Sequence, residues 1–93
     1  MQFVWDKRKA TSNQGKHGVS FAEAQTVFDD SHALLISDPD HSEDEDRFVL
    51  LGLSIALNML VVCHCYREGD EQIRIISARK ATKKETIEYE RRK

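Results

Sequence analysis

Short apolar or alternating runs of residues mark five stretches of the chain, and each of them predicts a β-strand. The five stretches cover residues 3–5, 33–36, 47–53, 59–66 and 72–79. The third stretch is almost continuously apolar, so we expect it near the middle of the sheet. The last two stretches are joined by a short polar segment, residues 67–71, which predicts a hairpin.

The register of this hairpin follows if its turn centres on Gly69 and Asp70. His64 then lies opposite Ile75, and Cys65 lies opposite Arg74. Strict alternation sorts the residues of the last strand onto two faces. One face carries Ile73, Ile75, Ser77 and Arg79, and the other carries Gln72, Arg74, Ile76 and Ala78. The two arginines of this strand are therefore expected on opposite faces of the sheet.

Three further stretches predict helices, because apolar residues at helical spacing follow a capping residue. Ser20 and Glu23 have the spacing of a capping box, in which the hydroxyl caps the helix and the carboxylate returns to the cap's N–H. That helix is expected to end at the acidic residues 29 and 30. Thr82 and Glu85 repeat the box and open a helix that runs to about residue 91. An earlier helix is expected over residues 6–14, capped by Asp6 and followed by a break at Gly15 or Gly18.

The predicted order of elements is one strand, two helices, four strands and a final helix. Consecutive strands with short links favour an antiparallel sheet, and we expect the helices to pack on one of its faces. A chain of 93 residues has room for one hydrophobic core. The prediction is a single small α+β domain, residues 1–93, with a mainly antiparallel sheet, two N-terminal helices and a C-terminal helix.

The formal net charge of −2 averages three segments of very different charge. Residues 1–16 sum to +3, residues 17–73 to −10 and residues 74–93 to +5. If the two basic ends are neighbours in space, they form one positive surface suited to a phosphate-rich ligand. A solvated mixture of charges has the same composition, so the charge alone does not select a nucleic-acid partner.

Two groups of potential metal ligands fit the known kinds of metal site poorly. Residues 38–46 hold six carboxylates and His41, but a calcium loop needs a glycine in its middle and this segment has none. We interpret it as a solvated loop. The sequence Cys63-His64-Cys65 supplies too few ligands at the spacing that zinc sites use. We therefore expect no metal and no other cofactor, and two reduced cysteines that pack as small apolar side chains.

The first residues lead directly into a charged stretch, and no apolar run is long enough for a membrane helix. We expect a cytoplasmic protein with no signal peptide and no membrane partner.

Three stretches resemble the BrnT family, the toxin component of a bacterial type II toxin–antitoxin system. They are Trp5-Asp6 followed by KHGVSF at residues 16–21, then His41 with EDR at residues 45–47, and finally RIISARKA at residues 74–81 with Glu85 and Tyr89 after it. The matches span nearly the whole chain in the family's order. The sequence departs from the family at Cys63-His64-Cys65, where a basic or aromatic residue is expected.

The resemblance implies a RelE-like fold and an endoribonuclease that cleaves RNA without a metal and thereby inhibits translation and growth of a bacterium. It also implies neutralisation by a BrnA-like antitoxin in a toxin–antitoxin hetero-oligomer. Attack by the ribose 2′-hydroxyl needs a base, an acid for the departing 5′-oxygen, and cations around the phosphorus. His17 is the best candidate for proton transfer because histidine exchanges protons near neutral pH. Lys16 adds a positive charge, although the same segment could be a plain link between two helices.

The other predicted site residues are mostly basic. Arg79 is expected to bind phosphate through its planar guanidinium, Arg47 to be a second phosphate clamp or an ion-pair partner, and Glu45 to be a candidate base. The predicted catalytic set is Lys16, His17, Glu45, Arg47 and Arg79, and the predicted substrate-binding set is Arg67, Arg74, Lys80 and Tyr89. Tyr89 is alternatively a packing residue of the last helix. The alternative function is a module that binds a protein or nucleic acid without chemistry.

Overall fold

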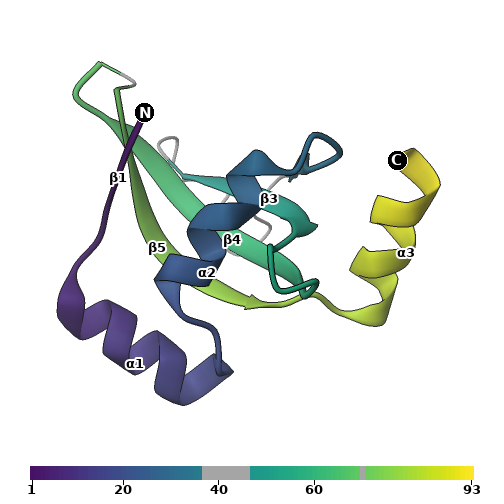
Figure 1. The fold of residues 1–93 in the computed structure, drawn as a ribbon, viewed down its shortest axis with the longest axis horizontal. Helices are drawn as coiled ribbons and strands as arrows, with labels where there is room; N and C mark the ends of the chain where they lie inside the picture. The colour runs from purple at the N-terminus through teal and green to yellow at the C-terminus, as the bar shows by residue number, and fades with distance from the viewer. Residues whose placement is uncertain (37–46, 70) are drawn as a thin grey trace.

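The strands form one five-stranded sheet in the computed structural model, which describes residues 1–36, 47–69 and 71–93 (Figure 1). They are β1 (Gln2–Val4), β2 (Leu34–Ile36), β3 (Phe48–Leu53), β4 (Met59–Arg67) and β5 (Gln72–Lys80). Their order across the sheet is β1-β5-β4-β3-β2. β1 runs parallel to β5, and the remaining neighbours are antiparallel. The predicted α+β class and the mainly antiparallel sheet are confirmed.

The central strand is β4, and the apolar strand at residues 47–53, expected near the middle of the sheet, is the interior strand beside it. β3 has β2 as its outer neighbour, whereas β4 lies between β3 and β5. The apolar pattern of β3 is continuous because both of its faces are covered. Leu51 packs under one helix layer and Leu50 under the other. Coverage of the faces and position in the sheet are separate properties.

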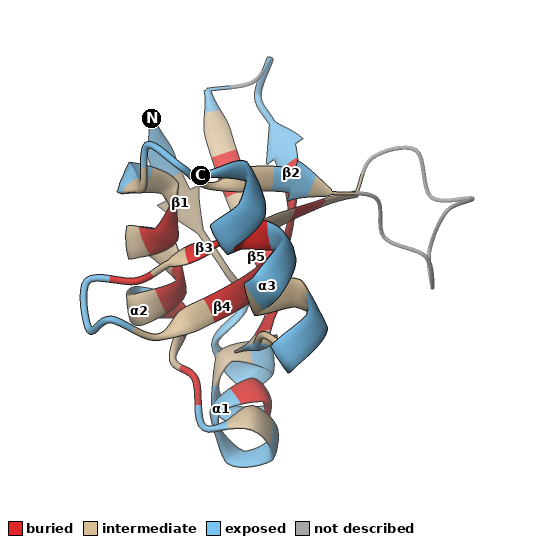
Figure 2. Cartoon of the chain, turned by 90° about the vertical axis from the view of Figure 1, so that its right-hand side faces the viewer, coloured by how far each residue is buried: buried red, intermediate tan, exposed pale blue. Residues whose placement is uncertain are grey.

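Helices lie on both faces of the sheet, and not on one face as predicted. The helical elements are α1 (Lys7–His17), α2 (Phe21–Thr26), a 3₁₀ turn η1 (Val27–Asp29) and α3 (Lys83–Arg92). Residues of α2 and η1 pack with Leu60, Val62 and Ile75 of the sheet, and α1 contributes Ala10 to this layer. On the opposite face Tyr89 of α3 packs on Val61 and its neighbours, so α3 stands apart from α2 (Figures 1 and 2).

The first helix begins and ends where its capping residues stand. The Asp6 carboxylate accepts hydrogen bonds from the backbone N–H groups of Arg8 and Lys9, and these bonds, led by the one from Lys9, lower the pKa of Asp6. The helix continues through Gly15 and stops at Gly18, whose φ of 69° is left-handed. Glycine adopts this conformation without strain. Of the two predicted alternatives, Gly15 and Gly18, it is therefore Gly18 that ends the helix.

The two predicted capping boxes differ in the structure. At Thr82 both halves form, since Thr82 accepts from the Glu85 N–H and the Glu85 carboxylate accepts from the Thr82 N–H. At Ser20 only the hydroxyl cap forms. The Glu23 carboxylate instead accepts hydrogen bonds from the side chains of Ser54 and Asn58 in the turn between β3 and β4. A tertiary contact has displaced the predicted local one.

The pairing of β4 with β5 confirms the predicted register near the turn and corrects it further along. His64 pairs with Ile75 and Cys65 with Arg74, as predicted. Between Cys63 and His64 the register shifts, because Cys63 pairs with Ser77 and Ile76 has no partner. This β-bulge inserts one residue into β5 and reverses the alternation after it. Ala78 therefore joins Ile75 in the core under α2, which strict alternation did not predict.

Candidate functional site

The bulge at Ile76 brings the two arginines of β5 onto the same face of the sheet. Arg74 pairs with Cys65 and Arg79 pairs with Val61, two β4 residues an even number of positions apart. Arg67 of β4 is also an even number of positions from Cys65 and Val61, so it lies on the same face. We call Arg67, Arg74 and Arg79 the arginine face; Val61, beside Arg79, packs with Tyr89 of α3. On β4 the partners of Arg74 and Arg79 are four residues apart, about 13 Å at the rise of an extended strand.

Arg47 lies close to this face at the start of β3. Phe48 pairs with His64 in the antiparallel ladder, so the preceding residue, Arg47, comes opposite Cys65. Cys65 is also the partner of Arg74 on the other side of β4. Arg47 and Arg74 therefore lie at the same level of the sheet, with the width of β4 between them. Both side chains are partly buried.

The C-terminal end of α1 is fixed to β5 by one buried side chain, Asn13. β1 ends at Val4 opposite Arg74, and among the described residues no strand pairs with the outer edge of β5 beyond that point. Asn13 takes that place, because its Nδ2 donates to Ala78 O at 2.8 Å and its Oδ1 accepts from the Ala78 N–H at 3.1 Å. Nδ2 also donates to Val19 O at 3.0 Å. Sequence reasoning missed Asn13, whose only signal was a polar residue within a helix.

Asn13 anchors α1 to β5 one helical turn before His17, the last residue of the helix. Residues four apart lie on the same face of a helix, one turn from each other, so His17 is stacked beyond Asn13 and its Ala78 contact. Arg79 and Lys80 directly follow Ala78. We call His17, Arg79 and Lys80 the β5 end cluster, in which Arg79, opposite Val61, lies on the α3 face of the sheet and Lys80, opposite Leu60, on the α2 face. Lys16 is exposed on the neighbouring position of the last turn of α1, while His17 is half-buried.

Arg79 is held by a bidentate ion pair with Glu85 of α3. Its Nη1 and Nη2 lie 2.8 and 2.9 Å from the two carboxylate oxygens, and Nη1 also donates to Lys80 O. The hydrogen bonds from Arg79, assisted by the N–H of Thr82, lower the pKa of Glu85 to about 2, so Glu85 is ionised at neutral pH. The Arg79 side chain keeps 42% of its surface exposed, so the pair orients a guanidinium that reaches the surface.

Tyr89 is a core residue and not a surface residue. It is only 3% exposed, and its hydroxyl donates to Asp30 Oδ2 at 2.7 Å. Burial, with a further contribution from the Asp30 carboxylate, raises the pKa of Tyr89 to about 12. In this position the ring cannot stack on an RNA base, which corrects the substrate-binding role predicted for it and supports the packing alternative. The predicted base Glu45, like His41, lies outside the residues that the structure describes.

The residues Cys63, His64 and Cys65 point to opposite faces of β4 and cannot share one metal ion. The cysteines are buried on the face of Val61. His64 is 0% exposed on the other face, where its ring packs against Phe28, Phe48 and Tyr66. Its Nδ1 lies 3.2 Å from Val62 O, Nε2 has no partner among the described residues, and burial lowers the pKa of the ring. His64 is therefore a neutral packing residue.

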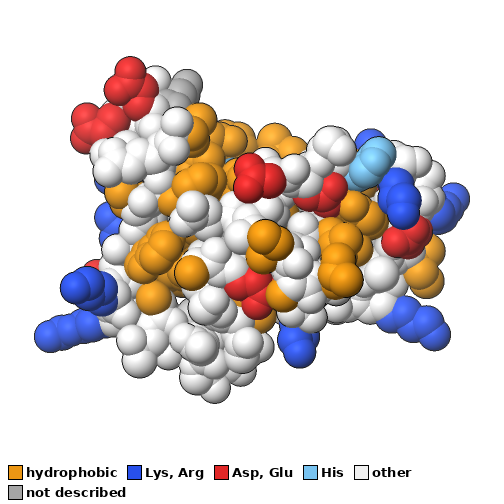
Figure 3. All heavy atoms as spheres, in the orientation of Figure 1, with side chains coloured by type: hydrophobic (Ala, Val, Ile, Leu, Met, Phe, Trp, Pro, Cys, Tyr) orange, Lys and Arg blue, Asp and Glu red, His pale blue; other side chains and the backbone are white. Residues whose placement is uncertain are grey.

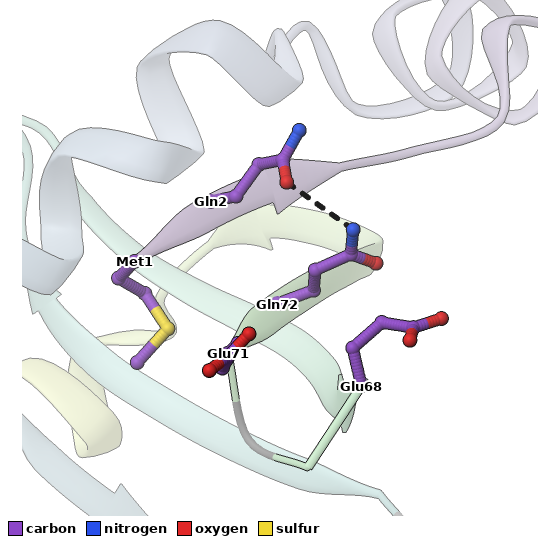
Figure 4. Close-up of a pocket in the computed structure, with 5 residues that line it drawn as sticks. All are labelled: Met1, Gln2, Glu68, Glu71 and Gln72. Carbon is purple, nitrogen blue, oxygen red and sulfur yellow. Dashed lines mark hydrogen bonds between the residues drawn. The ribbon is translucent and has the colours of Figure 1, made fainter.

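Acidic side chains mark the other end of the sheet. A shallow hollow beside the turn from β4 to β5 is lined by Met1, Gln2, Glu68, Glu71 and Gln72, with the two carboxylates around it (Figure 4). Carboxylates repel a polyanion, so this hollow is a poor RNA site. The face that carries α2 shows hydrophobic and acidic side chains across its middle and Lys and Arg side chains at its margins (Figure 3).

In residues 1–36, 47–69 and 71–93 no three His, Cys, Asp or Glu side chains gather as a metal site would require. Within the same residues, no helix has the length and apolar character needed to cross a membrane.

Comparison with known proteins identifies the family of this chain. The sequence model of the ribonuclease toxin BrnT of type II toxin–antitoxin systems matches residues 5–85. The chain belongs to the BrnT toxin family. A 1.1 Å crystal structure of the Brucella abortus ribonuclease toxin BrnT aligns with a TM-score of 0.69 and 26% sequence identity, over 89% of this chain and 99% of that one. No curated protein sequence matches the chain.

Membership of the BrnT family assigns the chain to the ribonuclease toxins and implies a protein antitoxin as its partner. The family match includes α1, the arginine face and the β5 end cluster, and it ends at Glu85, the ion-pair partner of Arg79. The BrnT match therefore covers α1, β4, β5 and the first turn of α3 up to Glu85, whereas Tyr89 falls beyond it.

Proposed function

We propose that this BrnT-family toxin is an endoribonuclease that cleaves RNA without a metal ion at the β5 end cluster and thereby stops translation and growth. The observation that supports the proposal is the Asn13–Ala78 contact, which attaches α1, one turn before His17, to the residue of β5 that precedes Arg79 and Lys80. The arginine face then supplies the binding surface for the flanking RNA backbone.

The chemistry requires proton transfer and charge neutralisation around one phosphate. The ribose 2′-oxygen attacks the phosphorus and loses its proton to a base, while the P–O5′ bond breaks and an acid protonates the 5′-oxygen. The products are a 2′,3′-cyclic phosphate and a 5′-hydroxyl. His17 is the proton-transfer group in this proposal, and Arg79 and Lys80 stabilise the charge that develops on the phosphorane. Lys16 and Arg47 remain proposed contributors to that charge stabilisation.

Glu85 contributes by positioning Arg79. A guanidinium held by two parallel hydrogen bonds keeps a fixed orientation, so it loses little conformational entropy when phosphate binds. A lysine at position 79 would keep the charge and lose this geometry. Arg67 and Arg74 lie too far along the sheet to contact the same phosphate, and we assign them to neighbouring ones.

The test is cleavage of a labelled single-stranded RNA by purified protein in the presence of EDTA. Wild-type protein is expected to release a product with a 2′,3′-cyclic phosphate end. His17→Ala and Arg79→Ala should each lower the rate by about 100-fold or more, because proton transfer and charge stabilisation each supply that much. Lys9→Ala removes a cation two turns earlier on α1 and should stay within twofold.

Each contrary result excludes one part of the proposal. RNA that is retained without any product would make the protein a binding module. Activity lost in EDTA and restored by Mg²⁺ would overturn the metal-free mechanism. Glu85→Gln controls for folding, because it breaks the same ion pair as Arg79→Ala but leaves the cation; equal loss in both, with equal loss of stability, would make Arg79 purely structural.

In the cell, the proposal predicts arrest of growth when this toxin is expressed without its partner, and relief by a BrnA-like antitoxin that forms a hetero-oligomer with it in the cytoplasm. A folded His17→Ala, Arg79→Ala double variant at wild-type abundance should permit normal growth. Co-expression with the antitoxin followed by a sizing column should show a single complex, and a toxin that elutes alone at matched expression would contradict this pairing.

A further inference from the structure

The turn between β3 and β4 exposes two large apolar side chains to solvent. Ile55 is 81% exposed and Leu57 is 77% exposed. The turn protrudes from the molecule next to α2 (Figure 2). We call residues 54–58 the apolar turn. Two such side chains within three positions, both on a projecting loop, cannot be explained by the core of this molecule.

The apolar turn is held rigidly by α2. The Glu23 carboxylate accepts from Ser54 Oγ at 2.6 Å and from Asn58 Nδ2 at 2.8 Å, and Thr26 Oγ1 accepts from the Ile55 N–H at 2.9 Å. Backbone bonds close the turn internally, from the Ser54 N–H to Asn58 O and from the Leu57 N–H to Ser54 O. A loop fixed in this way loses little entropy when a partner docks on it.

Leu57 adopts a backbone conformation that is unfavourable for its side chain. Its φ of 64° lies in the left-handed region, where glycine or asparagine is at ease and a branched residue is strained. Backbone strain of this kind persists where surrounding structure enforces it, often at sites of function. The turn requires a positive φ at position 57, and the residue at this position is a leucine whose large apolar side chain is exposed.

Acidic residues adjoin the apolar turn and exclude nucleic acid as its partner. A hollow of about 280 Å³ beside the turn is lined by Thr26, Asp29, Asp30, Leu53, Ser54 and Ile55. Asp29 is exposed, and hydrogen bonds from Leu53, His32 and Tyr89 outweigh burial and lower the pKa of Asp30, so this carboxyl is charged too. Carboxylates beside apolar side chains complement a protein segment with apolar and basic residues, and they repel a phosphate backbone.

We propose that the apolar turn is a docking surface for the antitoxin, through a segment that presents apolar side chains flanked by Lys or Arg. The inference rests on the proposed antitoxin partner and not on the proposed cleavage chemistry. The turn lies at the same end of the sheet as the β5 end cluster, because Leu60 just after it pairs with Lys80. A partner seated on the turn thus lies beside the proposed cleavage centre.

In the test, a purified BrnA-like antitoxin is titrated calorimetrically into wild-type toxin, three single variants and one double variant, without RNA. Ile55→Ser and Leu57→Gly should each weaken binding by at least tenfold. Leu57→Gly is the sharper probe, because it removes the side chain and also relieves the positive φ, so the melting temperature should stay unchanged or rise. Ile87→Ser, on an exposed apolar residue of α3, is the matched control and should change affinity less than twofold.

Three results would overturn the proposal. The first is an unchanged affinity in a folded Ile55→Ser, Leu57→Gly double variant. The second is an equal loss in Ile87→Ser, and the third is a wild-type dimer that the double variant abolishes, which would assign the turn to a second copy of this chain. RNA cleavage by the free variants should equal that of the wild type, so a failure of the cleavage proposal would be seen separately.

Discussion

Asn13 and Ala78 are joined by two hydrogen bonds, from Asn13 Nδ2 to Ala78 O at 2.8 Å and from the Ala78 N–H to Asn13 Oδ1 at 3.1 Å. The side-chain amide thus forms the pair of bonds that an additional strand would form with the outer edge of β5. One residue of α1 thus takes the place of a strand at the outer edge of β5 where β1 stops.

Asn13→Ala should destabilise the protein by about 2–4 kcal/mol, because it leaves the buried Ala78 N–H and carbonyl without partners. It should also lower the cleavage rate of the folded protein, since the last turn of α1 with His17 loses its attachment. Urea unfolding and single-turnover cleavage measure the two effects. Ser12→Ala, on an exposed neighbour in the same helix, should change neither, and a stable Asn13→Ala variant would show that Asn13 is not an anchor.

Stability should fall in acid as the Arg79–Glu85 pair is lost. The folded protein lowers the pKa of Glu85 from 4.5 to about 2, chiefly through the hydrogen bonds from Arg79. The ion pair therefore stabilises the folded state fully above pH 4.5, and its contribution disappears as the pH falls towards 2. Glu85→Gln should flatten the unfolding free energy across this interval. Glu88→Gln, which breaks an exposed pair with Arg92, should leave the slope in place.

Arg74→Ala should weaken binding of RNA by a similar factor for all sequences, because a backbone contact carries no base information. If Arg74 neutralises one phosphate, the slope of log K against log salt should decrease by about 1. A 2′-deoxy substrate analogue that cannot be cleaved permits the measurement at several salt concentrations. Arg92→Ala, at the far end of α3, removes the same charge. An identical slope change in both variants would mean that only net charge matters.

His64→Leu should remove a pH dependence of stability near neutrality. Burial lowers the pKa of His64 below 6.5, so the folded state resists a proton that the unfolded chain accepts. The folded state is thus favoured above pH 6.5 and loses free energy as the pH falls below that value. The leucine variant avoids an unpartnered buried Nε2 and should show a flatter profile from pH 7 to pH 5. The exposed His32 supplies the control, as His32→Gln should keep the wild-type slope.

The sequence predicted the elements of this fold well because their signals are local. Capping residues located the starts of all three helices, and the spacing of apolar residues located all five strands to within about two residues. The short hairpin even predicted that His64 faces Ile75. The sequence did not predict features that depend on residues far apart in the chain. Examples are the parallel pairing of β1 with β5 and the position of α3 on the other face of the sheet.

The candidate site was predictable in its residue types and not in its geometry. Charge by segment and the family motifs selected Arg74 and Arg79, but strict alternation separated them onto two faces. The bulge that unites them has no local signature at Ile76. Likewise Glu23 had the spacing of a capping box, and only the folded chain brings Ser54 and Asn58 close enough to bind its carboxylate instead.

The bulge at Ile76 also makes the number of residues between Arg74 and Arg79 decisive for this strand. Loss of a single residue from this part of β5 would leave net charge, composition and isoelectric point almost the same, yet it would return the Arg79 guanidinium to the opposite side of the sheet. The number of residues between Arg74 and Arg79 therefore determines which face of the sheet Arg79 lies on.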